Sequence, residues 1–294
     1  MTRVWRVRGR DVALARPFVV GILNVTPDSF SDGGRYSAVD AAVARAEAMA
    51  AEGADAVDVG GESTRPQGAT PVDAAEERRR VLPVVAELAR RMPSLVVSVD
   101  TVKATVAAAA LDAGAHVVND VSAFRLDANM AAVCARAGAG VVLMHSRGTV
   151  SEMGTYLHAA YGDDPAADVI AELGTAVDRA RDAGVADAAI VLDPGLGFAK
   201  RSADSLRLLS ELPRLGAAGY PLMVGASRKR FVGELTGVQS PADRVHGTVG
   251  ASVAALLRGA MLVRVHDVRA HREALDVAWA IAGAGAAEPV GARQ

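Results

Sequence analysis

Eight short apolar runs recur along the chain, and a longer alanine-rich stretch with helical spacing follows each of them. The runs close on polar or charged residues and span 18–24, 56–62, 95–100, 116–120, 141–145, 190–193, 222–227 and 261–266. Continuous Val, Ile and Leu runs are typical of parallel strands buried on both faces. The helical spacing predicts helices over 37–52, 72–91, 102–113, 127–137, 165–183, 202–216, 241–258 and 269–283. Eight strand-helix units predict a single-domain (β/α)8 TIM barrel of the α/β class.

The barrel is expected to occupy residues 18–284, between an N-terminal extension over 1–17 and a flexible C-terminal tail over 285–294. Two connections within it, residues 25–36 and 63–71, are unusually long and rich in turn-forming residues. Loops at the C-terminal face of such a barrel carry binding and catalytic residues. We therefore predict that these two segments are lids or binding loops.

Composition sets the size of the core and argues against several partners. The chain has 294 residues, is 51% hydrophobic and carries a formal net charge of −2. We expect no global attraction to nucleic acid or to an acidic membrane from such a charge. The basic N-terminus lacks the apolar core of a signal peptide, and Arg258 interrupts the longest apolar run. A cytoplasmic protein is the expectation.

Several familiar chemistries have no support in the sequence. The single cysteine, Cys134, lies in an alanine-rich stretch and is interpreted as a small buried hydrophobe, since no activating neighbour is evident. The six histidines include no H-E-x-x-H pair, and the chain has neither a P-loop nor a dinucleotide fingerprint. His145 alone is interpreted as a core or rim histidine.

Polar side chains that end predicted strands converge on one mouth of a barrel. Asp100 and Asp193 end the third and sixth runs, and Asn119 lies between them in the sequence. Carboxylates accept hydrogen bonds and an amide both donates and accepts, so this set suits a flat heterocycle with several N–H donors on one edge. The alternative is that each residue caps the helix that follows, which we favour for Ser63 or Thr101 taken alone.

Basic residues gather at the same predicted mouth. Arg264 and His266 lie two apart on the last strand, so their side chains share a face. Lys229 follows the seventh strand, and Arg65 lies in the loop after the second. Charge-assisted hydrogen bonds from these groups could hold a diphosphate, and barrels commonly bind phosphate after strands seven and eight. A solvated charge run is the alternative for Arg228 and Arg230, but it explains Arg264 poorly.

The segments GILNVTPDSFSDGG, VDVGGESTRP, SVDT, NDVSA, LMH, LDPGLGF, VGASRK and RVHD occur in this order between Gly21 and Val268. Together they closely resemble the dihydropteroate synthase family of pterin-binding enzymes. The resemblance implies a (β/α)8 transferase that joins 6-hydroxymethyl-7,8-dihydropterin diphosphate to 4-aminobenzoate in folate biosynthesis. The products are 7,8-dihydropteroate and diphosphate, and the family is the target of sulfonamides. The resemblance also implies a homodimer, which we expect to form through the alanine-rich last two helices.

Carried over by position, the resemblance implies three binding sets and a Mg2+ ion. The pterin set is Asp100, Asn119, Met144, Asp193 and Lys229. The diphosphate set is Asn24, Thr64, Arg65, Arg264 and His266, with Asn24 also positioning the metal. The aminobenzoate set is Pro66, Phe198, Ser227, Lys229 and Arg230. The residues expected to carry catalysis are Asn24, Asp100, Lys229 and Arg264.

The chemistry implied needs no protein nucleophile, because an electron-rich dihydropterin can expel diphosphate and leave a delocalised cation for the arylamine to attack.

The sequence departs from the family pattern at Gln67, Arg230, Asp204 and Ser205, which bear on the second substrate and on sulfonamide sensitivity. A pterin-dependent methyltransferase is the enzymatic alternative, although it gives no reason for Arg65, Arg264 and His266. A catalytically silent pterin-binding paralogue is the other, although such a relative should have lost part of these motifs.

Overall fold

The apolar runs form a closed barrel of eight parallel strands in the computed structural model, which describes residues 3–25, 35–62 and 72–284. The barrel strands are β3 (Phe18–Asn24), β4 (Ala56–Gly60), β5 (Val96–Asp100), β6 (Val117–Asp120), β7 (Gly140–Met144), β8 (Ile190–Asp193), β9 (Leu222–Val224) and β10 (Ala260–Val265). Each pairs with its neighbours in sequence, and β10 closes the barrel against β3. The predicted (β/α)8 fold is therefore confirmed.

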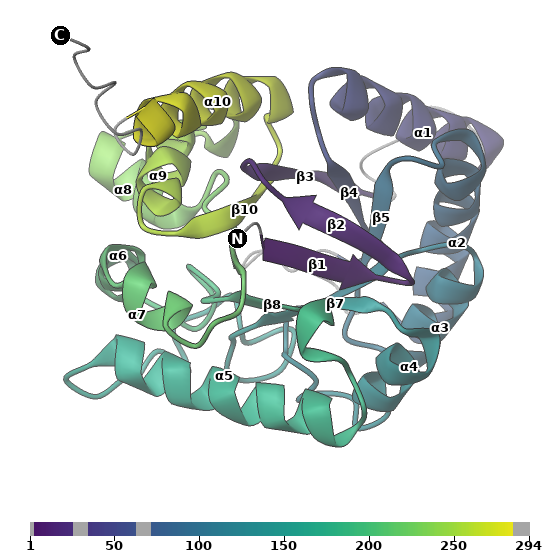
Figure 1. Ribbon diagram of the computed structural model, residues 1–294, viewed down its shortest axis with the longest axis horizontal. Helices are drawn as coiled ribbons and strands as arrows, with labels where there is room; N and C mark the ends of the chain where they lie inside the picture. The colour runs from purple at the N-terminus through teal and green to yellow at the C-terminus, as the bar shows by residue number, and fades with distance from the viewer. Residues whose placement is uncertain (1–2, 26–34, 63–71, 285–294) are drawn as a thin grey trace, which may run out of the picture.

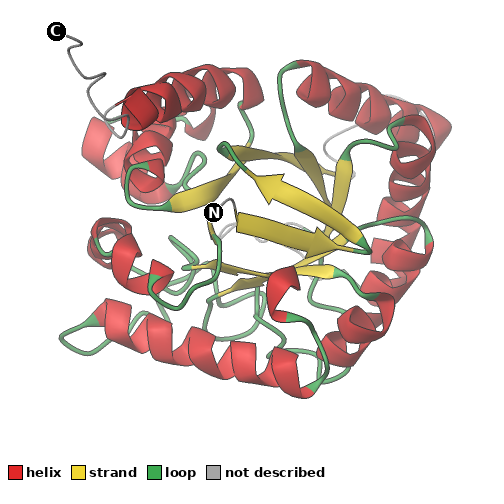
Figure 2. Ribbon diagram, viewed as in Figure 1, coloured by secondary structure: helices red, strands yellow, loops and turns green. Residues whose placement is uncertain are grey.

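Helices surround the barrel as a ring (Figures 1 and 2). They are α1 (Arg35–Ala51), α2 (Ala74–Arg91), α3 (Ala104–Asp112), α4 (Met130–Ala137), α5 (Pro165–Asp182), α6 (Ser202–Ser210), α7 (Leu212–Gly216), α8 (Arg230–Thr236), α9 (Val245–Leu256) and α10 (Val268–Ala284). Their apolar faces pack on the outside of the strands, and together with strand side chains they form the largest hydrophobic cluster. Among the described residues, no helix has the length and hydropathy needed to cross a membrane.

The helix prediction was wrong in three details. The expected helix over 202–216 is two helices, because Pro213 in the first turn of α7 cannot continue the α6 hydrogen-bond ladder. The expected helix over 241–258 begins as a short 3-10 turn at Pro241 and becomes α-helical only at Val245. Helix α8 was not predicted, and it ends at Gly237 in the left-handed conformation.

An antiparallel hairpin closes the N-terminal end of the barrel, within the segment expected to be an extension. It consists of β1 (Arg3–Val7) and β2 (Arg10–Leu14) and lies across the ring in Figure 1. Arg8 and Gly9 both have positive φ, as a two-residue type I′ turn requires. Trp5 is 2% exposed, packs with Phe18 and donates its indole N–H to the Ala189 carbonyl at 2.8 Å. The hairpin therefore leaves the opposite mouth as the end for chemistry.

Candidate active site

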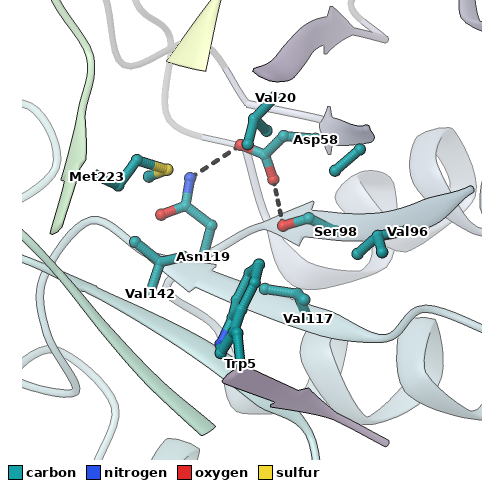
Figure 3. Close-up of a pocket in the computed structure, with 10 residues that line it drawn as sticks. Trp5, Val20, Asp58, Val96, Ser98, Val117, Asn119, Val142 and Met223 are labelled. Carbon is teal, nitrogen blue, oxygen red and sulfur yellow. Dashed lines mark hydrogen bonds between the residues drawn. The ribbon is translucent and has the colours of Figure 1, made fainter. Parts of the chain in front are cut away.

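A buried carboxylate, Asp58, organises the barrel interior beneath the mouth. Its two oxygens accept hydrogen bonds from Ser98 Oγ at 2.6 Å and from Asn119 Nδ2 at 2.8 Å, as Figure 3 shows. These bonds orient the Asn119 amide, whose Oδ1 is buried and has no partner in the described part of the chain. Asn119 therefore keeps a free acceptor.

Arg264 joins this network to the strand ends at the mouth. Its Nε donates to Asp58 Oδ2 at 2.6 Å and its Nη2 donates to Asp100 Oδ2 at 2.7 Å. Burial alone would lower the pKa of Arg264, but the two carboxylates outweigh this effect and raise it. Burial raises the pKa of Asp100 to about 7, with Arg264 opposing the shift and Asp58 adding to it. The cluster therefore holds one fixed cation between two carboxylates, one of which titrates near neutral pH.

A second pair of opposite charges lies across the mouth. Asp193, at the end of β8, is 2% exposed, and its Oδ1 accepts the Gly195 N–H at 2.7 Å. Burial raises the pKa of Asp193, and the charge of Lys229 opposes that shift. Burial also lowers the pKa of Lys229 to about 8. The charge of Asp193 opposes this shift, and the charge of Arg264 adds to it. Both residues therefore change charge more readily than their exposed counterparts.

Two glycines keep the space between these side chains open. A Cβ on Gly60 would lie 3.7 Å from Asp100 Oδ2 and 3.8 Å from Asn24 Oδ1, so both oxygens border the same gap. A Cβ on Gly225 would lie 4.0 Å from Asp193 Oδ2. Mg2+ prefers oxygen ligands and keeps several waters. Asp100 Oδ2 is already bound to Arg264, so Asn24 Oδ1 is the oxygen at this gap that would suit a hydrated magnesium ion.

One side of the mouth is apolar. Met144 is buried in a small cluster with Val102, Val121 and Met153, and the Phe198 ring packs against that cluster. The Lys229 Nζ lies 4.3 Å from the centre of the Phe198 ring, within the range of a cation–π contact. A flat ligand could therefore meet a thioether, an aromatic ring and an ammonium group along one wall.

The end of β10 is held against the loop after β9. Ser227 Oγ lies 2.9 Å from His266 Nδ1 and accepts the His266 backbone N–H at 3.1 Å. Arg230 is exposed, donates to the Gly154 carbonyl and stacks 4.4 Å from the centre of the Tyr156 ring. Ser227 and His266 therefore lie together at the rim, and Arg230 lies against the loop that follows β7.

The structure brings together most of the predicted site residues for which it gives a position. Thr64, Arg65, Pro66 and Gln67 lie outside the described residues, as does most of the predicted loop 25–36. The sequence analysis missed Asp58, although an acid inside an apolar strand is costly to bury unpaired and was a usable signal. It also assigned nothing to Lys200, whose Nζ lies 2.8 Å from His145 Nδ1 across 55 residues.

Cys134 and His145 are both buried, as interpreted from the sequence. Cys134 is fully buried, and burial raises the pKa of its thiol to about 12. His145 is buried between Lys200 and Glu172. Among residues 3–25, 35–62 and 72–284, no group of three His, Cys, Asp or Glu side chains is arranged to hold a metal ion.

The chain is similar to a known family of enzymes and to solved structures of its members. The family model described as pterin binding enzyme matches residues 20–266. The dihydropteroate synthase of Mycobacterium leprae is 50% identical over 279 residues, covering 92% of this chain and 96% of the relative. The Xanthomonas albilineans dihydropteroate synthase, solved with 4-aminobenzoic acid, has a TM-score of 0.88 and 45% identity, covering 98% of this chain and 100% of that one. The Yersinia pestis enzyme, solved as a sulfonamide drug complex, has a TM-score of 0.86 and 41% identity, covering 96% and 99%.

Proposed function

The chain belongs to the dihydropteroate synthase family of pterin-binding enzymes, and from this premise we propose how its mouth residues divide the work. It is a transferase of folate biosynthesis that binds pterins and 4-aminobenzoate. It condenses 6-hydroxymethyl-7,8-dihydropterin diphosphate with 4-aminobenzoate to give 7,8-dihydropteroate and diphosphate. The observation that carries the residue assignments is the cluster at the barrel mouth, where Arg264 donates to Asp100 and where Arg264 Cβ and Asp193 Oδ2 each lie 4.0 Å from the position of a Cβ on Gly225.

The pterin occupies the acidic side of the mouth in this proposal. Asp100, Asp193 and the unpartnered Oδ1 of Asn119 supply acceptors for the N–H groups on the edge of the heterocycle. Lys229 supplies a donor for its carbonyl or ring nitrogen, and Met144 packs on its face. A buried acceptor without a partner raises the free energy of the site, so a ligand that donates a hydrogen bond to it is bound in preference to one that cannot.

The diphosphate occupies the rim beside the pterin. Nε and one Nη2 hydrogen of Arg264 are bound to carboxylates, which leaves three of its five N–H donors for phosphate oxygens. His266 at the rim adds a further contact, and Thr64 and Arg65 are assigned to the same group from sequence. Asn24 would hold a Mg2+ ion on the diphosphate. When bound, this ion neutralises charge that develops on the leaving group.

The 4-aminobenzoate lies along the apolar wall. Phe198 supports its ring, and Lys229 lies beside the Phe198 ring at the polar end of the substrate. Ser227 and Pro66 are assigned to the same group from sequence. Arg230 pairs with its carboxylate from the rim. The guanidinium of Arg230 has no carboxylate partner among the described residues, so it is available for such a contact.

The residues then stabilise a dissociative substitution. The bond between the exocyclic methylene carbon and the diphosphate oxygen breaks, and the electron pair leaves with diphosphate toward Arg264. The carboxylate of Asp100 stabilises the delocalised pterin cation that results. The arylamine nitrogen donates its lone pair to the methylene carbon and then loses one proton. The mouth excludes water while the cation exists, because water would compete with the amine.

The direct test mixes purified protein, Mg2+, the pterin diphosphate and 4-aminobenzoate. We expect equal amounts of dihydropteroate and diphosphate, and a strong chelator should slow their release. Methyl transfer from methyltetrahydrofolate should be absent, which separates this reaction from that of pterin-dependent methyltransferases. Binding of the pterin without either product would instead indicate a silent paralogue.

We extend the proposal to the assembly and location of the chain. Val277 and Ile281 on α10 are 61% and 69% exposed, and an apolar groove runs between α6, α8 and α9. These surfaces support a homodimer through the last two helices. Ile281→Asp should then shift the sedimentation coefficient to that of a monomer. We also propose that the enzyme works in the cytoplasm, which fractionation of expressing cells would test.

A further inference from the structure

Lys200 is a buried cation that the proposed reaction does not use. It is 1% exposed, and its Nζ lies 2.8 Å from His145 Nδ1 and 3.1 Å from the carbonyl oxygens of both Gly195 and Phe198. These partners belong to the end of β7 and to the loop that follows β8. Lys200 therefore ties its own loop, which also carries Asp193 and Phe198, to the neighbouring strand end.

Burial and the charge of Lys229 lower the pKa of Lys200 well below its usual value, while Asp193 opposes the shift, so the role of Lys200 as a donor depends on the acceptors around it. Burial opposes ionisation of Glu172, but hydrogen bonds from His145 and Arg147 lower its pKa to about 2. Burial lowers the pKa of His145 to about 4, so its ring is neutral and carries one N–H. That hydrogen is assigned to Nε2, which faces the Glu172 carboxylate at 3.1 Å. His145 Nδ1 is then an acceptor, so four acceptors surround Lys200 Nζ, the most distant being the His145 carbonyl oxygen at 3.4 Å.

Backbone carbonyls of the 195–198 segment accept hydrogen bonds from two lysines, Lys200 and Lys229. Gly195 has a φ of 67°, and a Cβ there would lie 1.8 Å from the His145 carbonyl oxygen, so only glycine fits. Lys200 binds the carbonyls of Gly195 and Phe198, and Lys229 binds that of Leu196 between them. Ala199 continues the turn with a φ of 47°, a left-handed conformation that is unfavourable for an alanine. Lys200 therefore holds a strained backbone in place.

The same backbone sets the position of the Phe198 ring. Phe198 donates its N–H to the Gly195 carbonyl at 3.0 Å, and the next residue, Ala199, donates to the Met153 carbonyl at 2.6 Å. With its own carbonyl bound to Lys200, Phe198 has both main-chain polar groups fixed. Its ring consequently sits over the Lys229 ammonium and against the cluster that contains Met144.

We propose that Lys200 is a positioning residue for the second substrate, which fixes the 195–199 segment so that Phe198 presents its ring to the arylamine. This inference rests on the placement of 4-aminobenzoate against Phe198 given above. Lys200 does not touch the substrate, so its loss should weaken the use of the arylamine and spare that of the pterin diphosphate. A purely structural role would instead lower the amount of folded enzyme and move neither Michaelis constant selectively.

The test is a double-mutant cycle between Lys200→Met and Phe198→Ala, with both Michaelis constants measured. We expect Lys200→Met to raise the KM for 4-aminobenzoate about tenfold, which corresponds to about 1.4 kcal/mol. The KM for the pterin diphosphate should change less than about twofold. In the Phe198→Ala background, Lys200→Met should cause no further rise, because the ring it positions is already absent. Lys200→Gln keeps two N–H donors and should give a smaller rise than Lys200→Met.

A matched control is Arg201→Met, which removes the next cation along the chain from an exposed position. It should leave both Michaelis constants nearly unchanged. Equal rises in both constants, a loss confined to kcat, or additive rises in the double variant would overturn the proposal. Failure of both Lys200 variants to unfold cooperatively would also overturn it, since Lys200 would then be a determinant of folding. If Phe198→Ala leaves the KM for 4-aminobenzoate unchanged, the arylamine placement itself is wrong.

Discussion

The two ends of the barrel are built on opposite principles. At the N-terminal end, Trp5 and Phe18 meet edge to face at 6.0 Å, within a cluster of apolar side chains that the hairpin covers. At the C-terminal mouth, Asp58, Asp100 and Arg264 share partly buried ionic hydrogen bonds. Buried ion pairs contribute little net stability and are costly to break, whereas apolar packing stabilises directly. The N-terminal end of the barrel therefore contributes most to stability, and the C-terminal mouth carries the reactive groups.

The largest expected effect is on activity and comes from Arg264→Ala at the mouth. Removing one preorganised group that stabilises a leaving anion typically costs about 10²–10³-fold in kcat. We expect a loss at the upper end of that range, because Arg264 also holds Asp58 and Asp100. Steady-state kinetics with both substrates would measure it.

The fold should survive this change. Asp100 has a pKa of about 7 even beside Arg264, so it can take up a proton when the cation is removed and neutralise one of the two orphaned carboxylates. Arg136→Ala, at the exposed last turn of α4, is the matched control and should be fully active. Near-normal kinetics of the Arg264 variant would refute the diphosphate clamp.

The next effect is on stability and comes from Trp5→Ala at the closed end. Truncating a buried tryptophan typically costs about 3–5 kcal/mol, and the hydrogen bond to the Ala189 carbonyl is lost as well. Urea denaturation should report this loss, while kcat of the folded enzyme stays the same. Val4→Ala, on an exposed neighbour, should change the free energy of unfolding by less than about 0.5 kcal/mol. A large loss of kcat in the Trp5 variant would show that the two ends are coupled.

The sequence predicted the mouth better than the closed end. Strand ends of a parallel barrel converge by topology, so the polar residues at 100, 119 and 193 could be grouped without coordinates. The hairpin at residues 3–14 has alternating polarity and a turn at Arg8 and Gly9, yet it was treated as an extension. Its partners at the barrel floor are far apart in sequence, and a short hairpin is unstable unless it packs on such partners.

The residues that the sequence did not reveal are those whose roles depend on long-range pairing. Asp58 looks like a polar interruption of an apolar strand until Arg264, 206 residues away, is seen to bind it. Lys200 meets His145 across 55 residues. The inside or outside position of a side chain is invisible in a continuous apolar run, because both faces of such a strand are buried.

The pH dependence of kcat/KM sharpens the description of the mouth. The Asp100 carboxylate must be ionised to stabilise the pterin cation, and its pKa is about 7, so activity should fall as the pH drops below 7. Lys229 must be charged, and its pKa is about 8, so activity should fall as the pH rises above 8. We expect a bell-shaped profile with about a tenfold loss per pH unit on each side. Asp100→Asn should remove the acidic limb, whereas a profile that is flat from pH 6 to 9 contradicts these assignments.

The smallest effect is expected for Ser98→Ala, in the barrel interior between the two ends. Ser98 and Asp58 line an interior cavity of about 10 Å³ whose other walls include Trp5 and Val117 (Figure 3). The substitution removes one hydrogen bond to the Asp58 carboxylate, which keeps its bonds to Asn119 and Arg264. Unfolding in urea should therefore show a loss of about 1–2 kcal/mol.

Activity should fall less than about fivefold, since the cation at the mouth stays in place. The exposed Ser94→Ala is the control for the loss of a hydroxyl on the same strand-forming segment. If Ser98→Ala lowers activity as strongly as Arg264→Ala without loss of stability, the barrel floor belongs to the catalytic apparatus. In that case the separation between a stable end and a reactive end fails at this residue, because the hydroxyl would be orienting the Asp58 carboxylate for the reaction.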